Sequence, residues 1–254
     1  MPTFSANLGF LWQEHTLADA IRAAHTAGFN AVECHFPYNE PIMDVCEALE
    51  STSVSMLGLN TIRGSLNAGL AALPDKIPEA RQAIDQAFSY GSQMGAQNVH
   101  VMAGKTTGPS AETTYLENLR YASEIASRHD MSVLIEPLNP FDMPGYFLRD
   151  TVHACELLQT LNCSNVRLMF DCYHVGRTEG HVIERFNACY SFIGHIQFAS
   201  VPDRGPPDTG ELDYETIFRA IDRSGWKQPL GAEYIVLGST EDTLSWMHGL
   251  NPTE

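Results

Sequence analysis

At residues 133–137 the chain reads Val133-Leu134-Ile135-Glu136-Pro137: three branched aliphatic residues lead into a carboxylate and then a proline. A continuous apolar run of this kind is typical of a strand that is buried on both faces of a parallel sheet. Similar runs recur along the chain, separated by amphipathic helical patterns. The eight predicted strands are Phe4–Phe10, Ala31–Phe36, Val54–Asn60, Asn98–Ala103, Val133–Leu138, Val166–Cys172, Gly194–Ala199 and Leu230–Tyr234.

Several of the helical patterns between these strands have recognisable ends. Thr16 precedes one helix, with Asp19 three residues later as in a capping box, and Gly28 suits the position just past its end. Pro78 begins a second helix, and Asp213 is the expected N-cap of a third. The apolar positions at helical spacing are Leu17, Ala20, Ile21 and Ala24 in the first helix, Ala80, Ala83, Ile84 and Ala87 in the second, and Tyr214, Ile217, Phe218 and Ile221 in the third.

Eight strands alternating with eight helices predict an α/β fold, a (β/α)8 TIM barrel that forms a single domain over residues 1–254. A doubly wound open sheet is the alternative. Such a sheet should carry a glycine-rich phosphate turn after its first strand, but Asn7-Leu8-Gly9-Phe10-Leu11-Trp12 contains no GxGxxG. We therefore expect a barrel, with its functional residues at the carboxyl ends of the strands.

The overall charge limits the classes of partner. The 254 residues include 15 basic and 31 acidic side chains, a formal net charge of −16, which disfavours binding to nucleic acid or to an anionic membrane surface. We expect a small-molecule substrate instead. The absence of a signal-like N-terminus, of a long apolar run and of CxxC pairs predicts a soluble cytoplasmic protein with reduced cysteines. A homo-oligomer remains open.

Polar side chains end four consecutive predicted strands. Glu136, Asp171, Gln197 and Glu233 are spaced by about one strand–helix unit, so all four should point to one place. Any one of them alone would be read as a helix cap or a loop residue. Together, three carboxylates in an apolar barrel mouth would repel one another, and a divalent cation removes this conflict. Ligands that are all oxygens favour Mg²⁺ or Mn²⁺, with Co²⁺ also possible.

A divalent ion with two carboxylate arms is suited to moving a proton next to a carbonyl group. The ion would chelate the substrate's carbonyl and hydroxyl oxygens and stabilise an enediolate. Glu136 and Glu233 lie at opposite ends of the predicted arc and could act as proton acceptor and donor on two faces of the substrate. His195, two residues before Gln197, is either a ligand, a support for one, or a core histidine, and His100 either lines the pocket or bonds to the backbone.

Motifs spread along the chain resemble one known family. Taken in order, they are Phe4-Ser5-Ala6-Asn7-Leu8, Ala27-Gly28-Phe29-Asn30-Ala31-Val32-Glu33 with Phe36-Pro37-Tyr38, Val99-His100-Val101-Met102-Ala103-Gly104, Ile135-Glu136-Pro137-Leu138-Asn139, Asp142-Met143-Pro144-Gly145-Tyr146-Phe147-Leu148, Asp171-Cys172-Tyr173-His174, Gln197, Val201-Pro202-Asp203-Arg204 and Thr209-Gly210-Glu211. With these motifs the chain resembles the hydroxypyruvate isomerase family, including its 2-oxo-tetronate isomerase branch, within the xylose-isomerase-like barrels. The resemblance implies an intramolecular oxidoreductase of a small hydroxy-oxo acid or sugar.

The same resemblance implies roles for individual residues. Metal ligation would fall to Glu136, Asp171, Gln197 and Glu233, with the first and last also transferring protons. His174 and Arg204 would contact the substrate, since arginine can clamp a carboxylate with two hydrogen bonds.

This sequence also departs from the family, and other functions stay open. Ile235 and Leu237 stand where close relatives have a lysine and an arginine, and the loop that begins at Arg63 is short. These changes remove cations around the pocket but leave the predicted metal ligands and proton-transfer residues in place. The sequence therefore defines the type of reaction more firmly than the substrate. A ketose 3-epimerase on the same metal site is one alternative. A metal-dependent phosphodiesterase or endonuclease on a similar barrel, and a barrel that binds a metabolite without turning it over, are the others.

Overall fold

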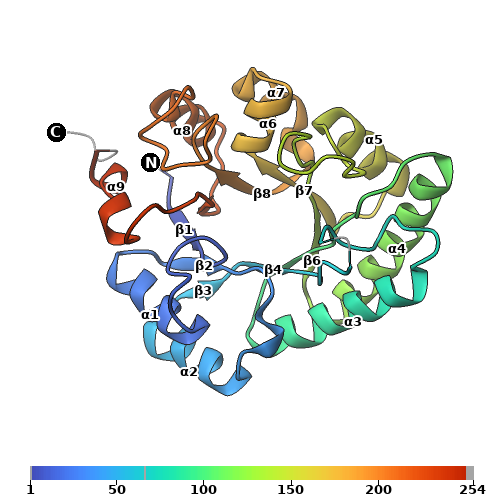
Figure 1. The fold of residues 1–254 in the computed structure, drawn as a ribbon, viewed down its shortest axis with the longest axis horizontal. Helices are drawn as coiled ribbons and strands as arrows, with labels where there is room; N and C mark the ends of the chain where they lie inside the picture. The colour runs from blue at the N-terminus through green and yellow to red at the C-terminus, as the bar shows by residue number, and fades with distance from the viewer. Residues whose placement is uncertain (1, 66, 250–254) are drawn as a thin grey trace.

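In the computed structural model, residues 2–65 and 67–249 are described, and they form a closed parallel barrel surrounded by helices (Figure 1). This confirms the predicted TIM barrel. Within these residues the sheet contains nine strands in the order β3-β2-β1-β9-β8-β7-β6-β5-β4. The strands are β1 (Phe4–Asn7), β2 (Ala31–Glu33), β3 (Ser55–Met56), β4 (Gly58–Asn60), β5 (Asn98–His100), β6 (Ser132–Ile135), β7 (Val166–Asp171), β8 (Ile193–Phe198) and β9 (Leu230–Ala232).

The third predicted strand closes the barrel, although it is interrupted at Leu57. Its first part, β3, pairs with β2, and its second part, β4, pairs with β5. The seam is continuous, because the Leu57 N–H donates to Val32 O at 2.7 Å and the Cys34 N–H donates to Gly58 O at 3.0 Å. The two short strands together therefore take the place of one of the eight predicted strands.

Helices begin and end where the local sequence signals place them. The Thr16 side chain accepts a hydrogen bond from the Asp19 N–H, and Asp213 accepts one from the Thr216 N–H. Gly28, just past the first helix, has a φ of +97°, which favours glycine. The helices are α1 (Leu17–Thr26), α2 (Ile42–Thr52), α3 (Ile77–Gln93), α4 (Pro109–Arg128), α5 (Thr151–Leu161), α6 (Cys172–Thr178), α7 (Val182–Cys189), α8 (Tyr214–Arg223) and α9 (Trp246–Gly249), with 3-10 turns at Pro37–Asn39, Tyr190–Phe192 and Glu241–Thr243.

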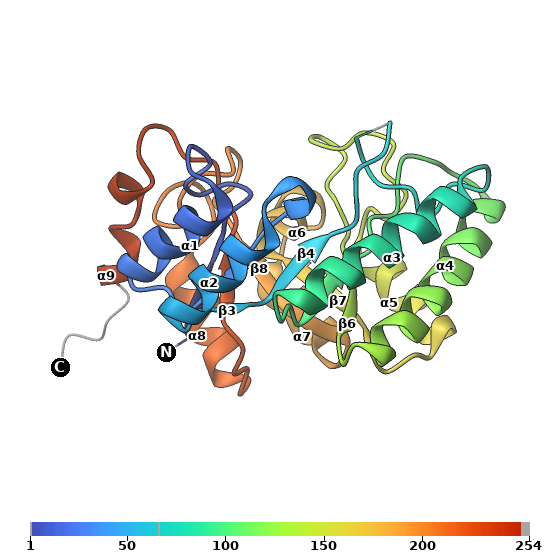
Figure 2. The same ribbon diagram turned by 90° about the horizontal axis from the view of Figure 1, so that it is seen from below.

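Most strands are shorter at their carboxyl ends than the apolar runs predict. The first run extends to Phe10, but β1 ends at Asn7, because Phe10 and Leu11 turn back and both donate to Asn7 O. The residues beyond these ends form the loops that rise together along one rim of the barrel, at the top of Figure 2. Glu136 and Glu233 each directly follow a strand, so both stand at the base of this rim.

Two residues close to the strand ends are held in the core. Trp12 is 1% exposed and packs edge-on against Phe29. Its indole N–H donates to Glu241 Oε1 at 2.7 Å, so its role is in packing. Cys172 is fully buried in the core. Among the described residues, no helix has both the length and the apolar character needed to cross a bilayer.

Candidate functional site

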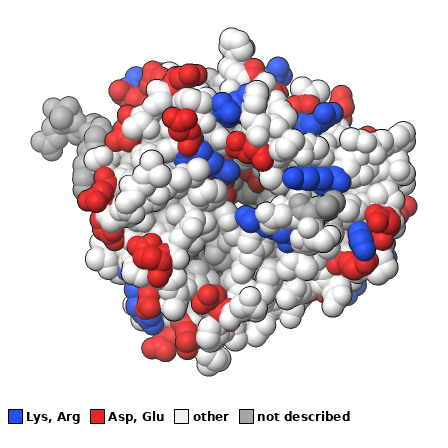
Figure 3. Space-filling model, in the orientation of Figure 1, with Lys and Arg blue, Asp and Glu red and all other residues white. Residues whose placement is uncertain are grey.

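The four predicted strand-end residues lie on adjacent strands at one end of the barrel. Asp171 closes β7 and is the register partner of Gln197 on β8, while Glu136 and Glu233 follow β6 and β9. All four side chains are buried. In Figure 3, which faces this end of the barrel, acidic side chains lie within a hollow near the barrel axis, and basic side chains border it.

Three of the four residues each carry a buried oxygen that lacks a hydrogen-bond partner among the residues that the structure describes. These atoms are Glu136 Oε1, Asp171 Oδ2 and Gln197 Oε1. Burying such an oxygen without a partner is costly, and a hard divalent cation prefers oxygen ligands of this kind. The donor set therefore fits the predicted metal.

Glu233 differs from the other three because both of its oxygens are already paired. Oε1 accepts hydrogen bonds from Asn7 Nδ2 and His35 Nε2, both at 2.9 Å, and Oε2 accepts one from Arg204 Nη2. Burial alone would raise the pKa of Glu233. The charge of Arg204 and the bond from His35 outweigh burial and lower this pKa to about 2, so the carboxylate is held ionised.

The pKa values of the other two acids shift in the opposite direction. Burial and the charges of Glu233 and Asp171 raise the pKa of Glu136 well above its ordinary value. Burial raises the pKa of Asp171 to about 7, although Arg204 opposes this rise. One cationic side chain therefore does not neutralise the cluster, and a proton or a divalent ion must supply the remaining positive charge.

His174 lies against these acids and has a defined orientation. Its Nδ1 accepts a hydrogen bond from the Asn139 N–H at 3.1 Å, so the neutral ring carries its proton on Nε2. Nε2 is 3.6 Å from Asp171 Oδ2 and 3.9 Å from Glu136 Oε1. Burial, with a further contribution from Arg204, lowers the pKa of His174 to about 3, so the ring is neutral near pH 7.

Glu136, Asp171 and His174 also form a group whose ligand atoms all lie within 4.8 Å of one another, close enough to hold a metal ion. The resemblance implied a substrate contact for His174 rather than metal ligation. Its protonated Nε2 favours that assignment, because a ligating nitrogen must be free of its proton.

Arg204 reaches the acid cluster from the loop after β8. Its guanidinium lies over the rings of Phe10 and Tyr173, with its central carbon 4.6 and 5.0 Å from the two ring centres. Besides its contact with Glu233, Nη2 is 3.7 Å from Asp171 Oδ2. Because the Arg204 carbonyl accepts a bond from the Ile235 N–H at 2.7 Å, the loop is tied to the segment after β9.

The sequence did not predict the contacts that hold the predicted residues in place. Asn7 and His35, from the first and second predicted strand segments, both bond Glu233. His195, whose role was left open, is a buried support: its Nε2 donates to Glu33 Oε2 at 2.9 Å. His100 has no hydrogen-bond partner on either ring nitrogen within the described chain, and its Nδ1 is 3.5 Å from Glu136 Oε2. It therefore lines the site.

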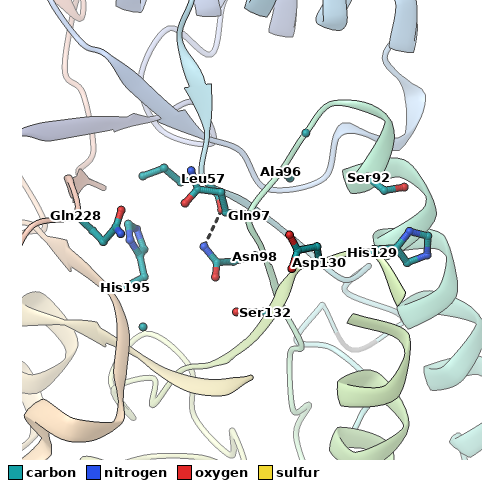
Figure 4. A pocket seen from close by; sticks show the side chains of 12 residues that line it. Leu57, Ser92, Ala96, Gln97, Asn98, His129, Asp130, Ser132, His195 and Gln228 are labelled. Atoms are coloured by element: carbon teal, nitrogen blue, oxygen red, sulfur yellow. Dashed lines mark hydrogen bonds between the residues drawn. The ribbon is translucent and has the colours of Figure 1, made fainter. Parts of the chain in front are cut away.

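A cavity of about 510 Å³ opens at the opposite, amino-terminal end of the barrel. Figure 4 shows His195 and Gln228 on one side of it and Asp130 and His129 on the other, with Asn98 donating to Leu57 O at 2.9 Å between them. The predicted catalytic, substrate and metal residues are not among those lining it. The cavity is therefore separate from the acid cluster.

Comparison with known proteins assigns the family. The model described as xylose isomerase-like TIM barrel matches residues 21–250. The 2-oxo-tetronate isomerase of Cupriavidus necator is 37% identical over 97% of this chain and 98% of its own length. The hydroxypyruvate isomerase of Escherichia coli is 35% identical over the same shares.

A solved structure agrees with this assignment. The crystal structure of an AP endonuclease, family 2, from Brucella melitensis superposes with a TM-score of 0.94 and is 33% identical, covering 99% of this chain and 100% of that one. Relatives named as isomerases match nearly the whole chain, and the barrel carries the strand-end acids that the resemblance implied. The chain is an isomerase and belongs to the xylose isomerase-like TIM barrel family.

Proposed function

We propose that this protein is a metal-dependent isomerase that interconverts aldose- and ketose-type forms of a small hydroxy-oxo acid, such as hydroxypyruvate or a 2-oxo-tetronate. Residues 1–254 would act as one domain. The substrate class rests on the names of the two relatives. The metal dependence rests on the buried, unpartnered oxygens of Glu136, Asp171 and Gln197.

In this proposal Glu136, Asp171, Gln197 and Glu233 hold Mg²⁺ or Mn²⁺, with Co²⁺ as a further option. When bound, the ion polarises the carbonyl and neighbouring hydroxyl oxygens of the substrate and so makes the C–H bond between them more acidic. The ion also balances the repulsion that otherwise raises the pKa of Glu136.

The protein's own groups then move and direct the proton. Glu136 and Glu233 directly follow β6 and β9, at the two ends of the arc of acids, so they can approach the substrate from two sides. One takes the proton from the hydroxyl-bearing carbon and the other returns a proton to the former carbonyl carbon, while the hydroxyl proton moves to the former carbonyl oxygen. His174 presents its Nε2–H to a substrate oxygen, and Arg204 faces the substrate from the loop above, where a guanidinium can clamp a carboxylate.

Proton exchange tests this proposal directly. The protein is incubated with Mn²⁺ in D₂O and with hydroxypyruvate or a 2-oxo-tetronate, and NMR follows deuterium at the carbon beside the carbonyl. We expect exchange that accompanies isomerisation and disappears when EDTA is added. An absence of exchange with three- to six-carbon hydroxy-oxo acids and sugars would contradict the proposal.

One comparison supports the nuclease alternative, because the Brucella melitensis protein is named as an endonuclease. Two observations favour the isomerase. The net charge of −16 opposes the approach of a phosphate backbone. Within the described residues, the metal-capable group contains one histidine, His174, whereas a multinuclear site would need more. A duplex oligonucleotide with an abasic site should remain uncut in the same Mn²⁺ buffer.

A further inference from the structure

Glu33 is a buried carboxylate that the proposed reaction does not use. It ends β2, on the side of the barrel facing Gln197 of β8. Its Oε2 accepts two hydrogen bonds, one from Gln197 Nε2 at 3.0 Å and one from His195 Nε2 at 2.9 Å. Glu33 is 5% exposed, so water competes little for these bonds.

The barrel leaves room for this carboxylate at a glycine. Gly231 on β9 is the register partner of Gln197, and a Cβ atom added there would lie 2.0 Å from Glu33 Oε1. Any other residue at this position would push the carboxylate out of place. The glycine leaves space for the Glu33 carboxylate, and the bond from His195 fixes this carboxylate against the Gln197 amide.

This arrangement determines which end of the Gln197 amide faces the acid cluster. A carboxylate oxygen that accepts two N–H bonds attracts the amide nitrogen and repels the amide oxygen. With Nε2 bound to Glu33, Oε1 points away, buried and without a partner among the residues described. The opposite orientation would place one oxygen against another and would turn two N–H donors toward the site.

We propose that Glu33 is a positioning residue that orients Gln197 so that its amide oxygen, rather than its nitrogen, faces the bound cation. This inference rests on the proposed function, since it requires a metal at the acid cluster. In this proposal Glu33 is not itself a ligand and acts only through Gln197. Its effect on the metal passes through the Gln197 amide, which can rotate. The effect should therefore depend on the group at position 197, whereas the effect of a purely structural residue should not.

The test is a comparison of Mn²⁺ affinity in two backgrounds, measured by isothermal titration calorimetry on folded protein. In the native background, E33M, which removes the acceptor, should weaken Mn²⁺ binding about 10- to 100-fold, as changes behind a metal ligand commonly do. In the Q197E background, E33M should cause no loss, because a carboxylate presents an oxygen in either orientation. E47M, on the exposed face of α2, is the matched control and should bind as wild type does.

The possible results separate the inference from the function on which it rests. Native-like Mn²⁺ affinity in folded E33M would overturn the role of Glu33 and leave the proposed function intact. Equal losses in both backgrounds would also overturn it, since a structural defect does not depend on the group at position 197. A wild-type protein that binds no Mn²⁺ would remove the metal site and both proposals. Circular dichroism and thermal unfolding establish that each variant is folded.

Discussion

Arg204 is the cation that holds the acid cluster together in the structure, and its removal should strongly lower the free energy of unfolding. Its guanidinium binds Glu233 and lies 3.7 Å from Asp171 Oδ2, with both carboxylates buried. In R204Q, Glu233 keeps its bonds from Asn7 and His35 but loses its only ion pair with an arginine or lysine within the described chain. A buried carboxylate left in this state destabilises the folded protein.

The magnitude follows from the pKa of Glu233. Its fall from an ordinary value of 4.5 to about 2 corresponds to about 3 kcal/mol of stability at neutral pH, of which Arg204 is the leading stabilising cause. Breaking a buried ion pair by removing one partner costs about 3–5 kcal/mol in other proteins. The two values agree, so we expect R204Q to lose about 3 kcal/mol.

The stability lost in R204Q should depend on pH in a defined direction. Because the folded-state pKa of Glu233 is lowered, its contribution is fully present above pH 4.5 and disappears as the pH falls toward 2. The difference between wild type and R204Q should therefore be largest near pH 7 and should narrow below about pH 5. Urea unfolding followed by circular dichroism, with EDTA present so that no metal replaces the guanidinium, measures this difference.

The control is R22Q on α1, which removes an exposed ion pair at 3.1 Å from Asp19. Such pairs contribute less than about 1 kcal/mol, so R22Q should unfold almost as wild type does. An R204Q variant within 1 kcal/mol of wild type at pH 7 would refute the reasoning. A difference that stays constant from pH 7 to pH 3 would refute it as well.

Three further results are expected. E136Q should lower turnover at least about 100-fold in the NMR exchange assay, since a positioned acid or base contributes about that much or more. Mn²⁺ affinity should fall between pH 8 and pH 6, with proton release seen by calorimetry in buffers of different ionisation enthalpy, because the pKa values of Glu136 and Asp171 are raised and protons compete with the metal. R63Q should lower kcat/KM about 10-fold for hydroxypyruvate but not for dihydroxyacetone, in which a neutral hydroxymethyl group replaces the carboxylate. Arg63 lies on the loop after β4, and its guanidinium is 4.5 Å from the centre of the Phe36 ring. Burial lowers the pKa of Arg63, and the charge of Glu233 opposes this effect.

Much of the barrel could be predicted from short stretches of sequence. Buried parallel strands need continuous apolar runs, and helix ends need specific caps, so Thr16 and Asp213 could be identified from their neighbours alone. The ends of the strands were less predictable. Apolar residues such as Phe10 continue past the last pairing position, because the loops at this end of the barrel also pack against the core.

The strand-end positions of Glu136, Asp171, Gln197 and Glu233 were predictable for the same local reason. A polar residue that directly follows a buried run marks the point where the strand leaves the core, and in a parallel barrel these points share one end. Their chemical states were not predictable. Glu136 and Glu233 both follow buried strands, yet the pKa of one is raised and that of the other is lowered.

What the sequence determined by itself is therefore the alternation of strands and helices and the end of the barrel at which the acids lie, since both depend on residues that are near neighbours in the chain. The tertiary structure alone decided the partners of those acids. Glu33 meets Gln197 across 164 positions, and His35 meets Glu233 across 198. Such contacts depend on strand tilt and on the depth of each side chain in the barrel, and no local pattern of residues encodes either quantity.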